Sequence, residues 1–322
     1  FTLRRYRMNE SGLPVSVQSR HASMDPRLYQ IVSLSTLLLY GLIWLGFEVP
    51  PSQIIVTLMT AFLTQYAGTR YARSPSVDLR SPLISALSLC LLLRTNDLAV
   101  AALAAFVAIA SKFVLRWRGK HLFNPTNLAL ASILATDLGW VSSGQWGQAA
   151  WFGFLIASLG GLVVTRAARA DVPLTFLGAY IGLLVARTLW LGDPLTIPLH
   201  QIQSGALLIF AFFMISDPKT TPDSPRGRRV FASIVAAAAF FLQFGLFRPH
   251  GPLWGLIACA PLVPLLDVWL PGLRYSWSRP ACGGPDGADG TSTVSPTSPS
   301  PPSSVPMFVP TTVSPYRQRR FP

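Results

Sequence analysis

This chain of 322 residues has few charged residues, few cysteines and few histidines. Only 12% of the residues are charged, whereas 51% are hydrophobic, and the mean hydropathy is +0.44. A soluble domain has about 25% charged residues, so the composition excludes an ordinary soluble protein. The scarcity of charge predicts a protein with many membrane-spanning helices.

The three cysteines are too scattered for a metal site or a disulfide framework. Cys90 and Cys259 lie in apolar runs and Cys282 lies in a Pro/Gly/Ser-rich stretch, with no CxxC spacing. We therefore expect no zinc site, iron–sulfur site or disulfide framework built from local motifs. The sequence also has no GxGxxG motif and no histidine pair suited to haem. Any electron path through this chain would need partner subunits to complete it.

Basic residues outnumber acidic ones by 26 to 13, which gives a formal net charge of +13. The cations form short clusters between apolar runs, so they indicate membrane topology and not nucleic-acid binding. A bilayer core of ~30 Å needs roughly 20 helical residues. Windows of that size give ten candidate spans, at about 28–48, 52–69, 79–95, 97–116, 124–139, 149–166, 172–190, 203–217, 228–247 and 251–270.

The fifth and eighth candidate spans are short, and each is a candidate for a half-helix or a strongly buried segment. The basic clusters fall in alternate connections, which predicts an even number of spans in the inner (cytoplasmic) membrane, with both termini in the cytoplasm. We expect three regions: a basic cytoplasmic segment at 1–27 with no visible cleavable signal peptide, a polytopic membrane domain at 28–275, and a disordered Pro/Ser-rich cytoplasmic tail at 276–322.

Two pairs of segments repeat at a nearly constant offset. Ser81 opens the third span much as Ser204 opens the eighth, and HLFNP at 121–125 opens the fifth much as RPHGP at 248–252 opens the tenth. Because five spans separate the members of each pair, the pattern predicts a five-plus-five inverted repeat with a site at the interface of its halves. The alternative is that the small residues and prolines only permit close helix packing. The predicted halves are about 28–139 and 149–270.

Three phrases carry a family resemblance: SGALLIFAFFMISDPKTTPDSPRGRRVF from Ser204, WRGKHLFNPTNLALA from Trp117 and RPHGPLWGLIACAPLVPLLD from Arg248. Together they resemble the membrane subunit family that contains the D subunit of Rnf-type electron transport complexes and the B subunit of the sodium-translocating NADH:quinone reductase. The chain looks most similar to the UnbU-like branch from enediyne biosynthesis clusters. The resemblance covers about 28–270. It implies an all-α integral membrane fold of ten helices in an inverted repeat, like that of urea transporters, and electron transfer coupled to ion movement.

The resemblance also implies a flavin site. In the D and B subunits a flavin mononucleotide is esterified to the threonine of a Ser-Gly-Ala-Thr motif, and the matching positions here are Ser204, Gly205, Ala206 and Leu207. Leucine has no hydroxyl, so no phosphoester can form at Leu207 and covalent flavin is not expected. The small residues Ser204, Gly205 and Ala206 still leave room for a noncovalent flavin mononucleotide or riboflavin.

Further candidate residues lie at the ends of two spans. His121, Asn124 and Asn127 surround the proline-started fifth span, where free backbone N–H groups attract anions, so they are candidates for holding a noncovalent flavin or another ligand. The alternative is an interfacial histidine with Asn124 as the helix N-cap. Asp217 and Lys219 end the eighth span as a cap and turn, or they help to hold a cation or headgroup there.

Two ionisable residues lie inside apolar runs. Lys112 is about one turn from Arg116, and we expect it to snorkel to the membrane surface as an anchor. Arg187 is expected either to snorkel or to pair with Asp193. In both cases a functional site is the alternative, because an ionisable group inside a span is costly.

The sequence identifies no catalytic or metal-ligating residue, and whether the chain is itself an enzyme stays open. Its expected partners are the lipid bilayer and other subunits of a membrane redox complex, and not nucleic acid. Two alternatives to the redox function stay open: a channel-like or carrier-like transporter, and a biosynthesis-associated membrane scaffold. Leu207 favours the transporter, whereas the FNP and DPKTTP motifs do not distinguish these functions.

Overall fold

The computed structural model describes the strands β1 (Tyr6–Met8) and β2 (Pro14–Ser16) and residues 25–74, 76–142, 150–202 and 204–275. β1 and β2 pair in antiparallel fashion. The basic segment expected at 1–27 lies mostly outside the described residues, and the tail expected at 276–322 lies entirely outside them.

The described part of the chain is mostly helical, which agrees with the expected all-α membrane protein. The first group of helices is α1 (Pro26–Ile43), α2 (Pro51–Tyr71), α3 (Arg80–Leu92), α4 (Leu98–Val114) and α5 (Pro125–Ala135). The second group is α6 (Ala150–Arg166), α7 (Asp171–Leu191), α8 (Thr196–Ile202), α9 (Gly205–Ile209), α10 (Pro225–Phe240), α11 (Gly251–Cys259) and α12 (Leu262–Trp269). Two π-helical segments, η2 (Phe210–Met214) and η3 (Phe241–Gly245), continue α9 and α10.

Short strands join some of the helices. β3 (Leu93–Arg94) pairs with β6 (Trp140–Val141), and β4 (Arg116–Trp117) forms a tight hairpin with β5 (Lys120–His121). Arg118 and Gly119 form the hairpin turn with positive φ angles of 49° and 77°. Positive φ at both central residues is typical of a type I′ turn, for which glycine is well suited.

Helix starts follow the residues that satisfy free backbone N–H groups. The side chains of Asp25, Asp97, Asn124 and Ser224 each accept a hydrogen bond from a backbone N–H in the first turn of α1, α4, α5 and α10. Proline lies in the first turn of α1, α2, α5, α10 and α11, where its missing N–H costs nothing.

Within the described residues, two helices are long and apolar enough to cross a membrane, Asp171–Leu191 and Pro225–Gly245. The number rises to four if each of two bent pairs forms one span: Thr196–Ile202 with Gly205–Met214, bent by 48°, and Gly251–Cys259 with Leu262–Trp269, bent by 54°. Each of the ten expected spans contains helix, but several helices are shorter than a bilayer core requires. The count of ten spans stays a prediction.

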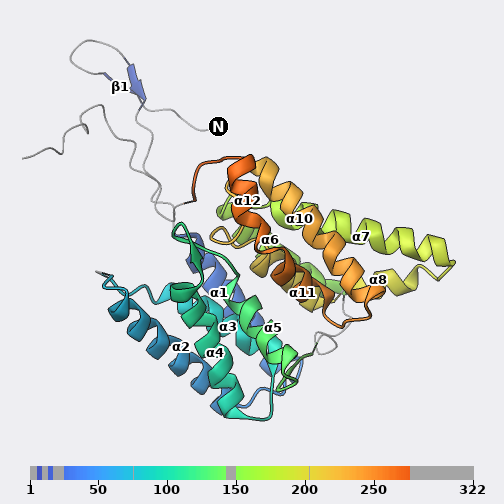
Figure 1. Ribbon diagram of the computed structural model, residues 1–322, viewed down its shortest axis with the longest axis horizontal. Helices are drawn as coiled ribbons and strands as arrows, with labels where there is room; N and C mark the ends of the chain where they lie inside the picture. The colour runs from blue at the N-terminus through green and yellow to red at the C-terminus, as the bar shows by residue number, and fades with distance from the viewer. Residues whose placement is uncertain are drawn as a thin grey trace, which may run out of the picture. The chain divides into compact units, whose positions relative to one another are not determined.

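The two groups of helices pack in similar ways. α2 lies against α4 in the first group, and α7 lies against α10 in the second (Figure 1). α5 packs against α4, and α11 packs against α10 in the same manner. Gly255 permits the second of these contacts, because a side-chain carbon there would lie 2.8 Å from the backbone nitrogen of Ala239 in α10.

The short helices α5 and α11 also touch one another near their first turns. The Asn127 side chain in α5 donates a hydrogen bond of 3.1 Å from Nδ2 to the carbonyl oxygen of Leu253 in α11. This bond joins two residues that are far apart in the sequence, one from each group of helices. It brings together the two segments that the sequence pairs as HLFNP and RPHGP.

Candidate functional site

A polar cavity of about 430 Å³ lies among the C-terminal ends of α2 and α4 and the N-terminal ends of α1, α3 and α5. Its volume falls in the range of about 300–1,000 Å³ that small-molecule sites occupy. Four of the predicted site residues line this polar cavity: His121, Asn124, Asp217 and Lys219. The structure therefore brings the HLFNP and DPKTTP segments to one place.

Asn124 connects these two segments directly. Its Oδ1 accepts a 3.0 Å hydrogen bond from the backbone N–H of Asn127, which confirms the expected N-cap. Its Nδ2 donates to the carbonyl oxygen of Met214 at 3.2 Å and lies 3.4 Å from Oδ2 of Asp217. One amide thus caps α5 and fixes the end of η2 beside it.

Asn127 lies deeper than Asn124 and is fully buried. Its Nδ2 is used by Leu253, but its Oδ1 has no hydrogen-bond partner among the described residues. A buried amide oxygen without a partner is costly, so a buried water molecule that donates a hydrogen bond would stabilise this position.

Asp217 and Lys219 form the turn that the sequence predicts. Asp217 Oδ1 accepts a 3.0 Å hydrogen bond from the backbone N–H of Lys219, and its carbonyl oxygen accepts from the N–H groups of Thr220 and Thr221 at 3.2 Å. Lys219 Nζ lies 3.4 Å from the carbonyl oxygen of Tyr275. Burial lowers the pKa of the Lys219 ammonium, and the charge of Asp217 opposes that shift.

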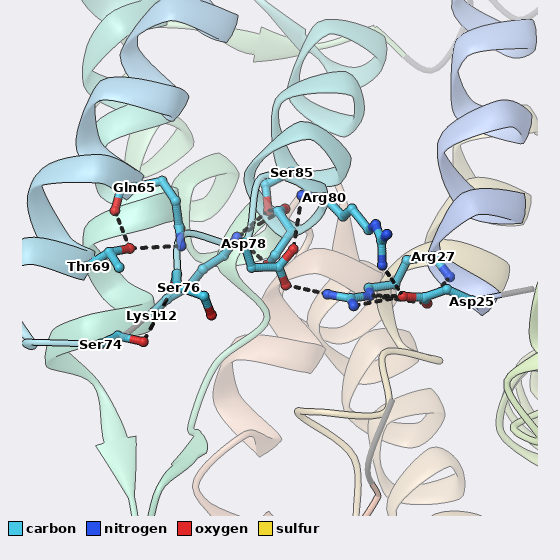
Figure 2. Close-up of polar contacts among 11 residues, drawn as sticks. Asp25, Arg27, Gln65, Thr69, Ser74, Ser76, Asp78, Arg80, Ser85 and Lys112 are labelled. Carbon is cyan, nitrogen blue, oxygen red and sulfur yellow. Dashed lines mark hydrogen bonds and ion pairs between the residues drawn. The ribbon is translucent and has the colours of Figure 1, made fainter. Parts of the chain in front are cut away.

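Lys112 does not snorkel, so the expectation of a surface anchor is wrong. Its side chain is 5% exposed and Nζ points into the polar cavity, where it donates to Ser81 Oγ at 3.0 Å and to Ser85 Oγ at 3.0 Å (Figure 2). A third hydrogen bond of 3.2 Å goes to the carbonyl oxygen of Ser81. Three acceptor atoms on α3 therefore bind the ammonium in the interior, whereas a snorkelling lysine would have only water as its partner.

A row of charged side chains lies between the start of α1 and the start of α3 (Figure 2). Arg27 forms ion pairs with Asp25 and Asp78, and Arg80 pairs with Asp25 at 2.7 Å. Burial opposes ionisation of Asp25, but the hydrogen bonds from Arg27 and Arg80 outweigh it and hold the pKa of this carboxyl below its usual value. Because Arg27 and Asp78 both line the polar cavity, this row forms part of its wall.

His121 is the predicted site residue with an unused ring atom. Its Nδ1 is buried and has no hydrogen-bond partner among the described residues. Burial, together with the positive charges of Arg116, Lys112 and Lys219, lowers the pKa of His121 to about 4. The imidazole, which lines the polar cavity, is therefore neutral at neutral pH.

The sequence interpretation missed the polar stripe of α2. Gln53, Thr57, Gln65 and Thr69 are all buried, and they recur at intervals of four residues with Ala61 between them. Gln65 and Thr69 line the polar cavity, and Oε1 of Gln65 is buried without a partner among the described residues. The i, i+4 spacing of polar residues inside an apolar window was a signal in the sequence, because such residues share one helix face.

The polar stripe of α2 ends at a second cavity of about 770 Å³, which Gln53 lines together with Arg94. Arg94 is 4% exposed and donates from NH1 to the carbonyl oxygens of Cys90 at 3.0 Å and Leu93 at 2.7 Å. A cation at this place satisfies carbonyl groups left free at the C-terminus of α3. Gln53 and Gln65 are twelve residues apart, or about 18 Å along the helix.

The predicted residues Ser204, Gly205 and Ala206 do not line the polar cavity. They form the N-terminal end of α9, about ten residues before Asp217, with Ser204 as an N-cap whose side chain makes no capping bond. Leu207 is buried in the same turn at 7% exposure. Its side chain has no oxygen, so this turn does not fit an esterified flavin.

The polar cavity has polar side chains on several sides. Gln65, His121, Ser81 and Ser85 all line it, and the two serine hydroxyl groups accept hydrogen bonds from Lys112. A wall of this kind suits a ligand with polar edges. Three of the predicted residues, His121, Asn124 and Asn127, lie at or directly behind this wall.

Arg187 behaves as one of the two sequence alternatives predicts. Its NH1 lies 3.6 Å from Oδ2 of Asp193, and its guanidinium stacks over the ring of Phe244 at 4.7 Å. The expected pair is confirmed, and Arg187 is not part of the polar cavity.

Comparison with known proteins finds a family match in the second part of the chain. Residues 135–275 match the NQR2, RnfD, RnfE family. This range includes Asp217 and Lys219 and also α9. It excludes the segment that runs from α1 to the end of α4, which supplies most of the residues that line the polar cavity.

Individual relatives match a stretch of similar length. The chain is 33% identical over 140 residues to the D subunit of an ion-translocating oxidoreductase complex of Escherichia coli (strain SMS-3-5 / SECEC), which is 42% of this chain and 36% of that relative. It is 31% identical over 137 residues to the D subunit of the complex of the same name from Citrobacter koseri, covering 41% of this chain and 35% of the relative. The chain thus spans little more than a third of the length of these relatives.

Proposed function

We propose that this chain, whose residues 135–275 match the NQR2, RnfD, RnfE family, is a membrane subunit of a complex that couples electron transfer to ion movement. Relatives at 31–33% identity are named as D subunits of ion-translocating oxidoreductase complexes, which is the observation that carries the proposal. Its partners are then the other subunits of that complex and the surrounding bilayer.

We propose that the membrane domain, 28–275, is a ten-span, five-plus-five inverted repeat of the urea-transporter kind, with both termini in the cytoplasm of the inner membrane. The matching packing of α2 on α4 and of α7 on α10 supports this arrangement. The contact between the first turns of α5 and α11 supports it as well, because inverted repeats bring short helices together near the bilayer midplane.

The polar cavity is the proposed site of a noncovalent flavin mononucleotide or riboflavin. His121 and Asn124 would lie along its polar edge, with Gln65 on the same cavity wall. When bound, a flavin supplies one-electron and two-electron redox chemistry. Lys112 stands beside this space, and its positive charge favours a ligand that gains negative charge on reduction.

The start of α9 has a different role in this proposal. Because Leu207 has no hydroxyl, the small residues Ser204, Gly205 and Ala206 serve helix packing in this proposal. The helix they begin contacts α6 at ordinary van der Waals distance, since a side-chain carbon at Gly153 would lie 3.6 Å from Cδ1 of Leu208.

Affinity purification of the tagged chain from its native membranes tests the proposal. We expect flavin-bearing or iron–sulfur subunits to copurify in fixed ratio with the chain. A chain that is isolated alone under several mild detergents, from membranes in which its expression is normal, contradicts the proposal.

A channel-like or carrier-like transporter is the second candidate. The specific observation in its favour is the polar stripe of α2, which leads from the polar cavity to the second cavity through Thr57 and Ala61. Flux of small ions into liposomes that contain only the purified chain would favour the transporter over the redox function. A membrane scaffold of the UnbU-like kind would show neither partners with redox cofactors nor flux.

A further inference from the structure

A separate cavity of about 380 Å³ lies between the β4–β5 hairpin, the loop before α10 and helix α12. We name it the hairpin cavity. His121 contributes to its wall as well as to the polar cavity, but the other residues that line the hairpin cavity are different. None of the functions proposed above uses it.

At the hairpin cavity the lysine forms ion pairs with carboxylates, whereas the two arginines do not form ion pairs within the described residues. Lys120 forms ion pairs with Asp223 at 3.0 Å and with Asp267 at 2.7 Å. Arg118 and Arg274 also line the cavity, and neither has an ion pair within the described residues. Both are exposed, which leaves two guanidinium groups facing solvent at the rim.

The two arginines lie at the same turn. A side-chain carbon at Gly119 would be 3.4 Å from NH2 of Arg274, so this guanidinium rests against the residue that follows Arg118. The turn is held by the pairing of Trp117 with Lys120 in the hairpin. The position of Arg118 is therefore fixed by the backbone and does not depend on a flexible loop.

The remaining wall of the hairpin cavity is apolar and continues onto the outer face of α12. Val263, Pro264 and Val268 line the cavity, and Val268 is 60% exposed. On the same helix Trp269 is 74% exposed, and Trp117 in the hairpin is 56% exposed. Exposed tryptophans beside a basic turn are typical of the membrane–water interface.

From these features we propose that the hairpin cavity binds the phosphate headgroup of an anionic phospholipid, with one acyl chain along the exposed face of α12. The planar guanidinium groups of Arg118 and Arg274 match a phosphate diester in geometry and charge. Basic pockets beside membrane helices are known to take anionic headgroups. Lys120 bonds to Oδ1 of Asp223, so Oδ2 can accept from a headgroup hydroxyl, and phosphatidylglycerol has both groups.

Native mass spectrometry of the full-length chain in mild detergent tests this proposal. We expect retained phosphatidylglycerol adducts on the wild-type chain and no comparable adducts of phosphatidylcholine. The double variant Arg118→Gln/Arg274→Gln should bind phosphatidylglycerol at least tenfold more weakly. The matched control is Arg70→Gln/Arg73→Gln, which removes the same charge from exposed arginines at the end of α2 and should bind as the wild type does.

Three results would overturn the proposal. The first is equal loss of binding in the control, which would show a nonspecific effect of net charge. The second is wild-type binding in the Arg118→Gln/Arg274→Gln variant. The third is full displacement of the lipid by an equal concentration of glycerol phosphate or inorganic phosphate, which would show a site for free phosphate. Melting temperatures close to that of the wild type confirm that both variants are folded.

Discussion

Lys112 shows how strongly one neighbour determines the direction of a side chain. Its Nζ is bound to two serine hydroxyls of α3 and lies at the cavity that also contains Asp217 and Asp78. A buried charge is often no more stabilising than an apolar residue of the same size. The lysine therefore serves the chemistry of the cavity more than it serves the stability of the fold.

This view predicts a contrast between two substitutions of Lys112. Lys112→Met should melt within a few degrees of the wild type or above it, since Ser85 Oγ can still donate to the carbonyl oxygen of Ser81 at 3.3 Å. Lys112→Glu should lower stability by about 3 kcal/mol, because it adds a third carboxylate to a space that already has two. Thermal unfolding of the two variants in the same detergent measures the difference, and equal destabilisation by both would contradict the account.

His121 gives a pH dependence with a defined sign. Its pKa is about 4 in the folded chain, against an ordinary value of 6.5. Above pH 6.5 the imidazole is neutral in both states and has no effect on the pH dependence of stability. As the pH falls from 6.5 towards 4, the unfolded chain binds a proton that the folded chain does not bind, so stability is lost.

We therefore predict that His121→Gln reduces the loss of stability between pH 7.5 and pH 4.5 by about 2.5 kcal/mol, because the interval from 6.5 to 4.5 spans two pH units at ~1.4 kcal/mol each. Unfolding of wild type and variant at a series of pH values measures this difference. Parallel curves for the two proteins across the whole range would show that His121 is not the group responsible.

At the scale of elements, α6 and η2 pack closely where Gly160 of α6 faces Phe212 of η2. A side-chain carbon at Gly160 would lie 2.6 Å from Cγ of Phe212, which is too near for any real contact. A side-chain carbon at the next residue, Gly161, would have no atom within 4 Å. The two residues are both glycines of α6, but only Gly160 lies against another element.

This difference makes a matched pair of substitutions. Gly160→Ala should destabilise the chain by about 1–3 kcal/mol, because η2 must move away from α6. Gly161→Ala should be neutral or stabilising by up to about 1 kcal/mol, since alanine is the better helix former. Melting temperatures of the two variants test the packing of α6 on η2, and the reverse order of stability would contradict it.

The sequence predicted the positions of most helices because apolar windows, capping residues and prolines act locally. Asn124 and Ser224 are examples, since each caps the helix that follows it. The direction of a side chain is not local in this way. Lys112 was placed wrongly because its distance from the helix end is visible in the sequence, whereas its contact with α3 is not.

The candidate site was predictable only in part for the same reason. The residues of the HLFNP and DPKTTP motifs were found separately, but nothing in either motif showed that Asn124 bonds to Met214 and Asp217 across some 90 residues. The polar stripe of α2 was missed because a count of apolar residues in a window ignores which face the polar ones share.

At the scale of the whole molecule, the family match and the polar cavity come from different parts of the chain. Residues 135–275 carry the family match, while the segment that runs from α1 to the end of α4 supplies most of the cavity wall. Asp217 and Lys219 connect the family match with the polar cavity, because they lie in the matched region and also line the cavity. A flavin in this cavity would therefore need both parts of the chain, and Leu207 would leave it noncovalent.

The visible absorption spectrum of the purified chain, taken before and after denaturation and removal of the protein, tests the central claim most directly. The account predicts a flavin band that remains in the protein-free solution, because the ligand is held in the polar cavity without a covalent bond. Flavin that stays attached to the denatured chain would contradict the assignment at Leu207. A preparation from native membranes with no flavin band would contradict the redox function itself.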